Sequence, residues 1–333
     1  MFRKRLLLSV LVFVALLASA CGSPSTGSGS SAKFTGTIHI ASSTWTGYAP
    51  LYVATSRNIW KNHGLTVDFS DVEDPVLRLN ALKANQLQGM ASTVDAFARA
   101  QSQGVPAVEV FPIDASVGGD GILAKNSIQS VQDLRGKTVA VNQGSVSEWF
   151  LGQVLKKNGL SLSDVKEQNM TSGTAGSTFV AGKVDVAVTW EPWLTKASHT
   201  SFGHVLVSSR DYPDLIMDSF AFRKDFIDKY PGTVKDFISA YYEAYNWMKA
   251  NPDAANTVIG TAVKESAADV QADLGTMTIF DLSAAKQVMG TASNHGKIYA
   301  NVKAAADFWK QQNAISSEVN PDNAVNPSFI NSL

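Results

Sequence analysis

Short runs rich in β-branched residues alternate along this chain with segments in which apolar residues recur at helical spacing. The first pattern predicts buried strands, and the second predicts helices that cover a sheet. In the first third of the chain the predicted strands are Thr37–Ala41, Leu65–Phe69, Met90–Ser92 and Ala107–Phe111. The helices predicted between them are Pro50–Lys61, Asp74–Asn85 and Asp95–Gln103. Strands that alternate with helices indicate a mainly parallel sheet covered on both faces.

The alternation starts again in the middle of the chain and then gives way to helix. The later predicted strands are Lys137–Val141, Val165–Asn169, Val184–Val188, His204–Val207 and Met217–Phe222. The helices predicted among them are Glu148–Lys157, Thr178–Gly182 and Pro192–Ser198. From Thr233 to Trp309 the pattern is nearly all helical. The chain therefore reads as two α/β halves followed by a helical part.

The run DASVGGDGILAKN, residues 114–126, separates the two halves. It combines the carboxylates Asp114 and Asp120 with several glycines. Glycines beside carboxylates indicate a backbone that bends sharply or that lets another group come close. Such a cluster fits either a surface turn or a ligand loop that leads into a strand crossing between two lobes. Its position between two α/β halves favours the crossing, with Gly119 and Gly121 as candidate hinge residues.

The N-terminus has the features of an export signal. A basic start, Met1–Arg5, precedes an apolar stretch, Leu6–Leu17, and the small residues Ala18–Ala20. The stretch is too short for a retained membrane helix, so residues 1–20 are predicted to be a signal peptide. Cys21, the only cysteine, follows directly, as in a bacterial lipobox, and is the expected site of lipid attachment. The alternative is an ordinary signal peptide with a chance cysteine. A lone cysteine excludes an internal disulfide and a cysteine-based metal site.

Composition narrows the class of protein. Residues 21–33 are rich in Gly and Ser and are expected to form a flexible tether. The remaining 300 or so residues suggest two lobes rather than one core. The formal net charge is -1 and 17% of residues are charged, so no basic patch recommends a nucleic-acid partner. We expect a globular, monomeric protein.

Four segments resemble one family of binding proteins. They are WTGYAPLYVATSRNIW (45–60), NALKANQLQGMAST (80–93), SVQDLRGKTVAVNQGSVSEWFL (130–151) and FVAGKVDVAVTWEPW (179–193). In this order they resemble the solute-binding proteins of ABC transporters, in the nitrate/sulfonate/taurine branch that also includes thiamine-pyrimidine binders. The resemblance implies a protein held by a lipid anchor at the outer face of the cell membrane, or on its periplasmic side, which delivers a small ligand to a permease and an ATPase.

The resemblance also implies an α/β type II periplasmic-binding-protein fold with two lobes of mainly parallel sheet and two crossings. Lobe one would comprise residues 34–119 and 218–333, and lobe two residues 121–217. The ligand would lie between them at the ends of the strands.

Loops at the predicted strand ends supply the candidate binding residues. These are Trp45, Tyr48, Thr93, Asp95, Asp114, Ser116, Asp120, Ser145, Trp190, Glu191 and Asp218. Local roles compete at several positions. Thr93 and Ser145 also fit helix N-caps, and Asp95 fits the first turn of a helix. Tyr48 could equally pack inside lobe one, and Asp218 could belong to an ordinary turn.

The charges of these loops predict the kind of ligand. Five of the candidates are acidic, and the same loops contain no Arg, Lys or His. A carboxylate withdrawn from water without a partner costs several kcal/mol, so we expect a small cationic nitrogen compound. Guanidinium suits this set, because it can be held bidentately by carboxylates and stacks on indole rings. The resemblance adds that relatives with the GGDGI and TWEPW segments are tied to urea or guanidine metabolism. Sulfonate, taurine, nitrate and thiamine-pyrimidine precursors remain the alternatives.

An enzyme of thiamine-pyrimidine synthesis is the rival class of protein. Such enzymes use a cysteine-rich segment and a reactive histidine, whereas the only cysteine here is Cys21 and the five histidines are scattered. No histidine pair has the spacing of metal ligands on a helix, and no glycine motif cradles a phosphate. We therefore expect a binding protein without cofactor or metal.

Overall fold

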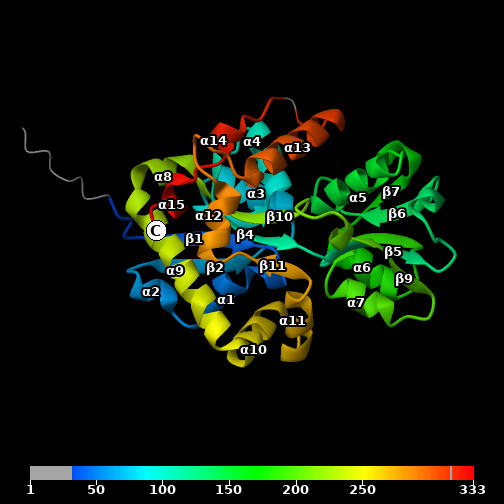
Figure 1. Ribbon diagram of the computed structural model, residues 1–333, viewed down its shortest axis with the longest axis horizontal. Coiled ribbons are helices and arrows are strands. Elements are labelled where there is room, and N and C mark those ends of the chain that lie inside the picture. The colour runs from blue at the N-terminus through cyan, green and yellow to red at the C-terminus, as the bar shows by residue number, and fades with distance from the viewer. Residues whose placement is uncertain (1–31, 316) are drawn as a thin grey trace, which may run out of the picture. The chain divides into compact units, whose positions relative to one another are not determined.

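A computed structural model describes residues 32–315 and 317–333 of the chain (Figure 1). The predicted signal peptide, the lipid attachment at Cys21 and all but the end of the tether lie outside the described residues. In the described part no helix is long and apolar enough to cross a membrane.

The first sheet has six strands in the order β11-β4-β10-β3-β1-β2. Their bounds are β1 Thr37–Ser42, β2 Thr66–Asp71, β3 Gly89–Thr93, β4 Ala107–Ser116, β10 Met217–Arg223 and β11 Met277–Ile279. Strand β1 runs parallel to β2 and β3, whereas β10 is antiparallel to both β3 and β4. Residues from the early and late parts of the chain therefore share one sheet.

The second sheet has five strands in the order β7-β6-β8-β5-β9. Their bounds are β5 Asp120–Lys125, β6 Thr138–Val141, β7 Lys166–Asn169, β8 Val186–Trp190 and β9 Gly203–Ser208. Strand β6 is parallel to its neighbours, but β5 is antiparallel to β8 and β9. Both sheets are thus mixed, because β10 and β11 in the first sheet and β5 in the second run against the direction of the other strands.

Strand β4 of the first sheet and β5 of the second are separated by only three residues, 117–119. The backbone N–H groups of Val117 and Gly119 both donate to the carbonyl of Thr276, at 2.8 and 3.1 Å, which fixes this crossing against the segment before β11. Strand β4 extends further than the sequence pattern predicts, so Asp114 and Ser116 lie within the strand and not in a loop. The chain returns from β9 to β10.

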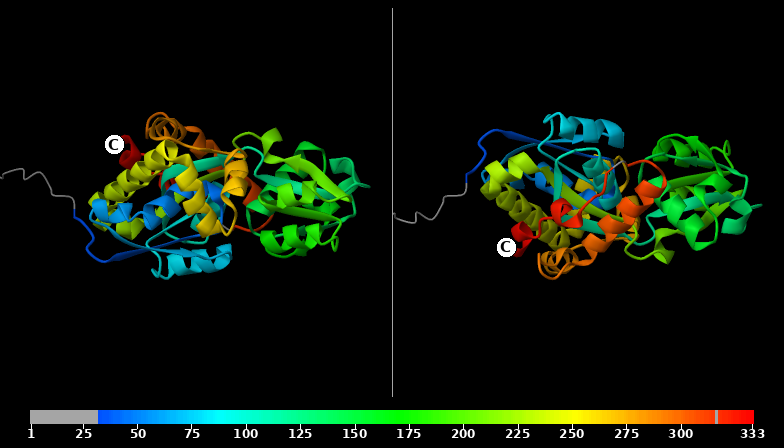
Figure 2. Two further views of the ribbon diagram at one scale, coloured as in Figure 1. Left: turned by 90° about the horizontal axis from the view of Figure 1, so that it is seen from below. Right: turned by 90° about the horizontal axis from the view of Figure 1, so that it is seen from above.

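Helices cover the sheets (Figure 2). Their bounds are α1 Ala49–Ser56, α2 Ile59–Asn62, α3 Pro75–Lys83, α4 Val94–Ser102, α5 Val146–Lys157, α6 Ser172–Val180, α7 Trp193–Ser198, α8 Lys224–Lys229, α9 Pro231–Ala250, α10 Pro252–Val263, α11 Ala267–Leu274, α12 Leu282–Met289, α13 Lys297–Gln311, α14 Pro321–Ala324 and α15 Ser328–Asn331. Two differences from the predicted helices have local causes. The predicted helix Pro50–Lys61 is interrupted at Asn58, which adopts a left-handed conformation with φ 57°. The predicted helix Thr178–Gly182 begins earlier, because Thr171 caps α6 through the backbone N–H of Thr174.

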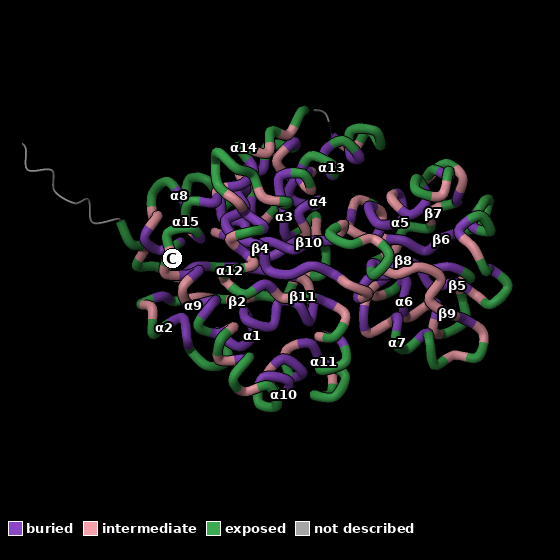
Figure 3. The backbone as a smooth tube through the Cα atoms, viewed as in Figure 1, coloured by how far each residue is buried: buried purple, intermediate pink, exposed green. Residues whose placement is uncertain are grey.

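Strands β4 and β10 are buried along their whole length (Figure 3). In the first sheet the rings of Phe111 and Phe220 stack at 5.5 Å between centroids, and Phe220 also contacts Phe222 and Phe237. Phe220 is completely buried. This aromatic cluster fixes β10 against β4 and α9, and so fixes the strand that bears Asp218.

Replacing Phe220 by Ala is expected to lower the free energy of unfolding by about 3–5 kcal/mol, because the cavity left by the ring cannot be refilled. Heat unfolding followed by circular dichroism measures this. The control is Leu77→Ala, since Leu77 is 59% exposed and its loss should change stability by about 0.5 kcal/mol or less. Equal effects of the two substitutions would contradict this account of the core.

Candidate functional site

The chain leaves β1 and forms a tight turn, Thr46–Tyr48, before α1. This turn presents Trp45 and Tyr48 next to strands β4 and β10. Gly47 allows the turn to lie close to β4, because a Cβ there would come within 2.3 Å of Asp114 Oδ2 and of Trp45 Nε1. A side chain at position 47 would therefore displace the first loop.

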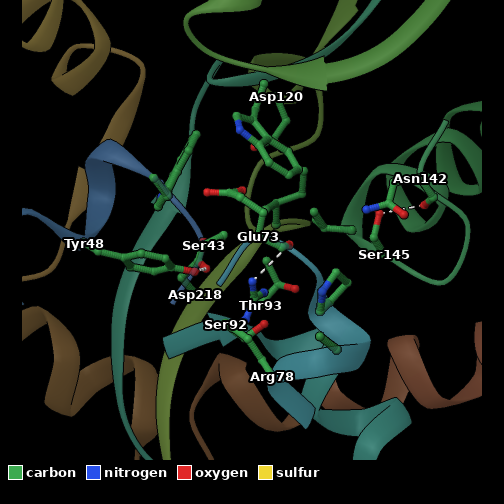
Figure 4. Close-up of a pocket in the computed structure, with 16 residues that line it drawn as sticks. Ser43, Tyr48, Glu73, Arg78, Ser92, Thr93, Asp120, Asn142, Ser145 and Asp218 are labelled. Atoms are coloured by element: carbon green, nitrogen blue, oxygen red, sulfur yellow. Dashed lines mark hydrogen bonds between the residues drawn. The ribbon is translucent and has the colours of Figure 1, made fainter. Parts of the chain in front are cut away.

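A cavity of about 50 Å³ lies beside this turn (Figure 4). Residues of both sheets line it. Asp120 and Trp190 are cross-strand partners on β5 and β8, and Thr93 and Asp218 are cross-strand partners on β3 and β10. In Figure 4, Asp120 lies across the cavity from Arg78, Ser92 and Thr93.

Seven of the sequence-predicted residues line the cavity and four do not. Those that line it are Trp45, Tyr48, Thr93, Asp120, Ser145, Trp190 and Asp218. Those that do not are Asp95, Asp114, Ser116 and Glu191.

The side chains of Asp114, Ser116 and Glu191 form hydrogen bonds with other groups of the protein. Both carboxylate oxygens of Asp114 accept a hydrogen bond from the Trp45 indole N–H, at 3.2 and 3.4 Å. The Ser116 hydroxyl pairs with that of Ser209 at 2.7 Å.

The carboxylate of Glu191 accepts from the backbone N–H and the hydroxyl of Thr195, at 2.9 and 3.0 Å, so it caps the start of α7. Asp95 is 2% exposed, and its Oδ2 has no hydrogen-bond partner among the described residues.

Sequence reasoning missed two charged residues of the cavity, Glu73 and Arg78. The loops named above do lack a basic residue, but Arg78 enters from helix α3, so the charge count from the loops alone was incomplete. Arg78 is only 4% exposed, and its Nη1 donates to the carbonyls of Val72 and Glu73. The signal was present in the sequence, since Arg78 lies four residues before the buried Leu82 and so on the covered face of the helix.

The remaining residues of the lining are smaller or less polar. They are Ser43, Pro75, Ser92, Ala96, Asn142, Val146 and Ile216. Ser145 caps helix α5 by accepting from the backbone N–H of Ser147, and its hydroxyl donates to the Asn142 carbonyl at 2.7 Å. The start of α5 therefore faces the cavity with its cap already in place.

Burial governs the charge of the two central carboxyl groups. It raises the pKa of Asp120 to about 7, although the Ser116 hydroxyl opposes the shift. Burial likewise raises the pKa of Asp218 to about 7, against the opposing effects of the Tyr48 hydroxyl, which donates at 2.5 Å, and of Arg78. Both groups therefore titrate near neutral pH.

The pKa shifts predict how stability depends on pH. Because folding raises both pKa values, the folded state retains protons that the unfolded state releases above about pH 4. The free energy of unfolding of the ligand-free protein should therefore fall as the pH rises from about 4 through about 7. Asp120→Asn should reduce this fall, at about 1.4 kcal/mol per unit of pKa shift removed. Heat unfolding across this range measures both proteins. Parallel curves would contradict the assignment.

Comparisons with known proteins agree with this architecture. A family model described as NMT1/THI5 like matches residues 45–255. The taurine-binding periplasmic protein of Escherichia coli is 27% identical over 255 residues, which cover 75% of this chain and 73% of that protein. A putative aliphatic sulfonates-binding protein of Bacillus subtilis is 25% identical over 335 residues, 97% of this chain and 95% of that one.

Solved structures share the fold. The alkanesulfonate-binding protein SsuA from Xanthomonas axonopodis pv. citri, bound to MOPS, superposes with a TM-score of 0.73 at 18% identity, covering 89% of this chain and 99% of that one. The predicted α/β periplasmic-binding-protein fold is thus confirmed. The relatives are named as binding proteins, which agrees with the prediction of a binding protein rather than an enzyme. The chain belongs to the NMT1/THI5-like family.

Proposed function

We propose that this protein is the extracytoplasmic solute-binding component of an ABC importer and that it captures a small cationic nitrogen compound, with guanidine as the best fit. The observation that carries the proposal is a small cavity with three carboxyl groups, one guanidinium and two indole rings in its lining.

The charges of the lining favour a cation. Glu73, Asp120 and Asp218 face a single basic residue, Arg78. Arg78 reduces the cost of ionising Asp218, since its charge lowers the pKa of that carboxyl. Asp120 has no such partner. Burial raises its pKa, and the nearby carboxyl groups of Asp218, Asp95 and Glu191 add to the shift, so its ionised form is costly. A ligand cation next to Asp120 would offset that cost.

The size of the cavity favours a ligand of few atoms. The cavity volume is only about 50 Å³, which suits a small ligand. Guanidinium has four non-hydrogen atoms, whereas taurine has seven. Guanidinium therefore requires less room than taurine in this cavity.

Two indole rings supply flat walls. Trp190 reaches the cavity from β8 of the second sheet, and Trp45 reaches it from the loop after β1 of the first sheet. A guanidinium stacked on an indole gains about 0.5–2 kcal/mol from the cation–π interaction. Its planar edge would stay free to donate hydrogen bonds to Asp120.

A taurine-like zwitterion is the second candidate. Arg78 lies in the lining, and Ser145 places the N-terminus of α5 there, and both features suit an anionic group. The ammonium would then pair with Asp120. The likeness to a protein named as taurine-binding supports this reading.

A lipid anchor at Cys21 and a soluble monomeric body complete the proposal. Cys21→Ala should move the exported protein from the membrane fraction to the soluble fraction of the producing cells, which immunoblotting of the two fractions detects. If the variant stayed in the membrane fraction to the same extent as the wild type, the lipid anchor would be wrong.

A thermal-shift screen followed by calorimetry tests the ligand. Guanidinium should raise the melting temperature at lower concentration than taurine does. Asp120→Asn should weaken guanidinium binding by about 10-fold or more, since a charge-assisted hydrogen bond contributes about 1.5–3 kcal/mol. Asp185→Asn is the matched control, because Asp185 is exposed, pairs with Lys125 and does not line the cavity, and it should bind as the wild type does. Stabilisation by taurine alone would overturn the guanidine assignment in favour of the zwitterion.

A further inference from the structure

Asp114 is a buried carboxyl whose two oxygens accept from one aromatic side chain. It lies inside β4 with no exposed surface. The indole N–H of Trp45 donates to its two oxygens at 3.2 and 3.4 Å. Asp114 itself does not line the cavity, whereas Trp45 does. The carboxyl therefore lies at the N–H edge of the indole ring and outside the lining of the cavity.

The opposite end of the indole is also confined. A Cβ on Gly119 would lie 2.8 Å from Trp45 Cη2, so the benzene end of the ring lies against the bare backbone of the crossing. Gly47 leaves the N–H end free to approach Asp114, since a Cβ there would come within 2.3 Å of both partners. The ring is thus held at one end by a hydrogen bond and at the other by close packing.

The neighbouring strand repeats the arrangement. Asp218 on β10 is the cross-strand partner of Asp114 on β4, and it accepts the hydroxyl of Tyr48 at 2.5 Å. Trp45 and Tyr48 belong to the same turn. Two adjacent aspartates therefore anchor the two aromatic side chains of one loop, at spacings set by the sheet.

The stability of the fold does not by itself explain why a carboxyl group is buried at Asp114. Burial raises the pKa of Asp114 well above its usual range, and Asp218 adds to the shift. A buried carboxyl that lacks a cation is costly, and apolar residues of similar volume often serve stability as well or better. The presence of a carboxyl at this position is better explained by its hydrogen bond to Trp45, which fixes the orientation of the indole ring.

We propose that Asp114 is a positioning residue: it holds the Trp45 ring as a flat wall for the ligand and does not touch the ligand. This inference rests on the proposed function, in which a planar cation stacks on that ring. It also separates the two aspartates, since Asp218 lines the cavity and Asp114 acts only through Trp45.

Two substitutions separate positioning from other roles. Asp114→Asn keeps an oxygen that can accept the indole N–H, whereas Asp114→Leu removes the acceptor at similar volume. Calorimetry with guanidinium should show affinity within about threefold of the wild type for the Asn variant and a loss of about 10-fold for the Leu variant, because a ring without its anchor must be ordered when the ligand binds. The melting temperature of the Leu variant should not fall, which excludes unfolding as the cause.

A double-mutant cycle tests the route through Trp45. Trp45→Phe removes the N–H donor, so adding Asp114→Leu to it should cost less than about twofold more, whereas independent effects would multiply. Multiplying losses, or full affinity in the Leu variant alone, would overturn the positioning role.

A nuclear magnetic resonance spectrum of the ligand-free protein separates the positioning role of Asp114 from the proposed ligand. The indole N–H resonance of Trp45, assigned by its loss in Trp45→Phe, should shift in Asp114→Leu and shift little in Asp114→Asn. An unchanged resonance in the Leu variant contradicts positioning even if guanidinium binds. If the wild type binds no guanidinium while the resonance shifts as expected, the proposed ligand is wrong and the positioning of the ring stands.

Discussion

The burial of carboxyl groups at the ends of adjacent strands is the constraint on which the rest of this site depends. Asp114, Asp218 and Thr93 form a cross-strand row on β4, β10 and β3. Asp120 lies at the first position of β5 in the other sheet. Each carboxyl is costly when buried and ionised, and burial raises the pKa of all three. The surrounding residues can be understood as partners that lower this cost: Tyr48 and Arg78 for Asp218, Trp45 for Asp114, and a proposed ligand cation for Asp120.

The two crossings between the sheets determine where these carboxyl groups lie. Only three residues separate β4 from β5, so aspartates six positions apart in the chain belong to different sheets. The return strand β10 then enters the first sheet between β3 and β4, which places Asp218 next to Asp114. Both sheets are therefore mixed. If β10 ran parallel to β4, Asp218 near its start would lie at the opposite end of the strands from Asp114.

Much of this could be predicted from the sequence, and the failures have physical causes. Periodicity located most strands and helices, and loops after strands supplied Trp45, Asp120 and Trp190. The predicted strand Ala107–Phe111 is shorter than β4 because the end of β4 contains Asp114 and Ser116. Hydrophobic periodicity does not identify buried strand positions that are occupied by polar residues. Arg78 is absent from the residues predicted from loops after strands, because it reaches the cavity from helix α3.

The pairing of Asp114 with Trp45 could not be predicted at all, because it depends on tertiary contact across 69 positions. Local signals describe an element and its ends, but they do not specify which side chains of distant elements share a hydrogen bond. For the same reason the sequence could propose carboxylates as a group without separating those that line the cavity from those behind it.

The central claim is that the site selects for positive charge, and calorimetry with guanidinium and urea tests it most directly. The two molecules are planar and nearly the same size, and they differ in charge. With excess carboxyl groups in the lining, guanidinium should bind more tightly than urea by about 100-fold or more, as a charge-assisted pair in a buried site predicts. The preference should grow as the pH rises through about 7, where Asp120 ionises. Equal affinity for the two compounds, or a preference for urea, would contradict the account.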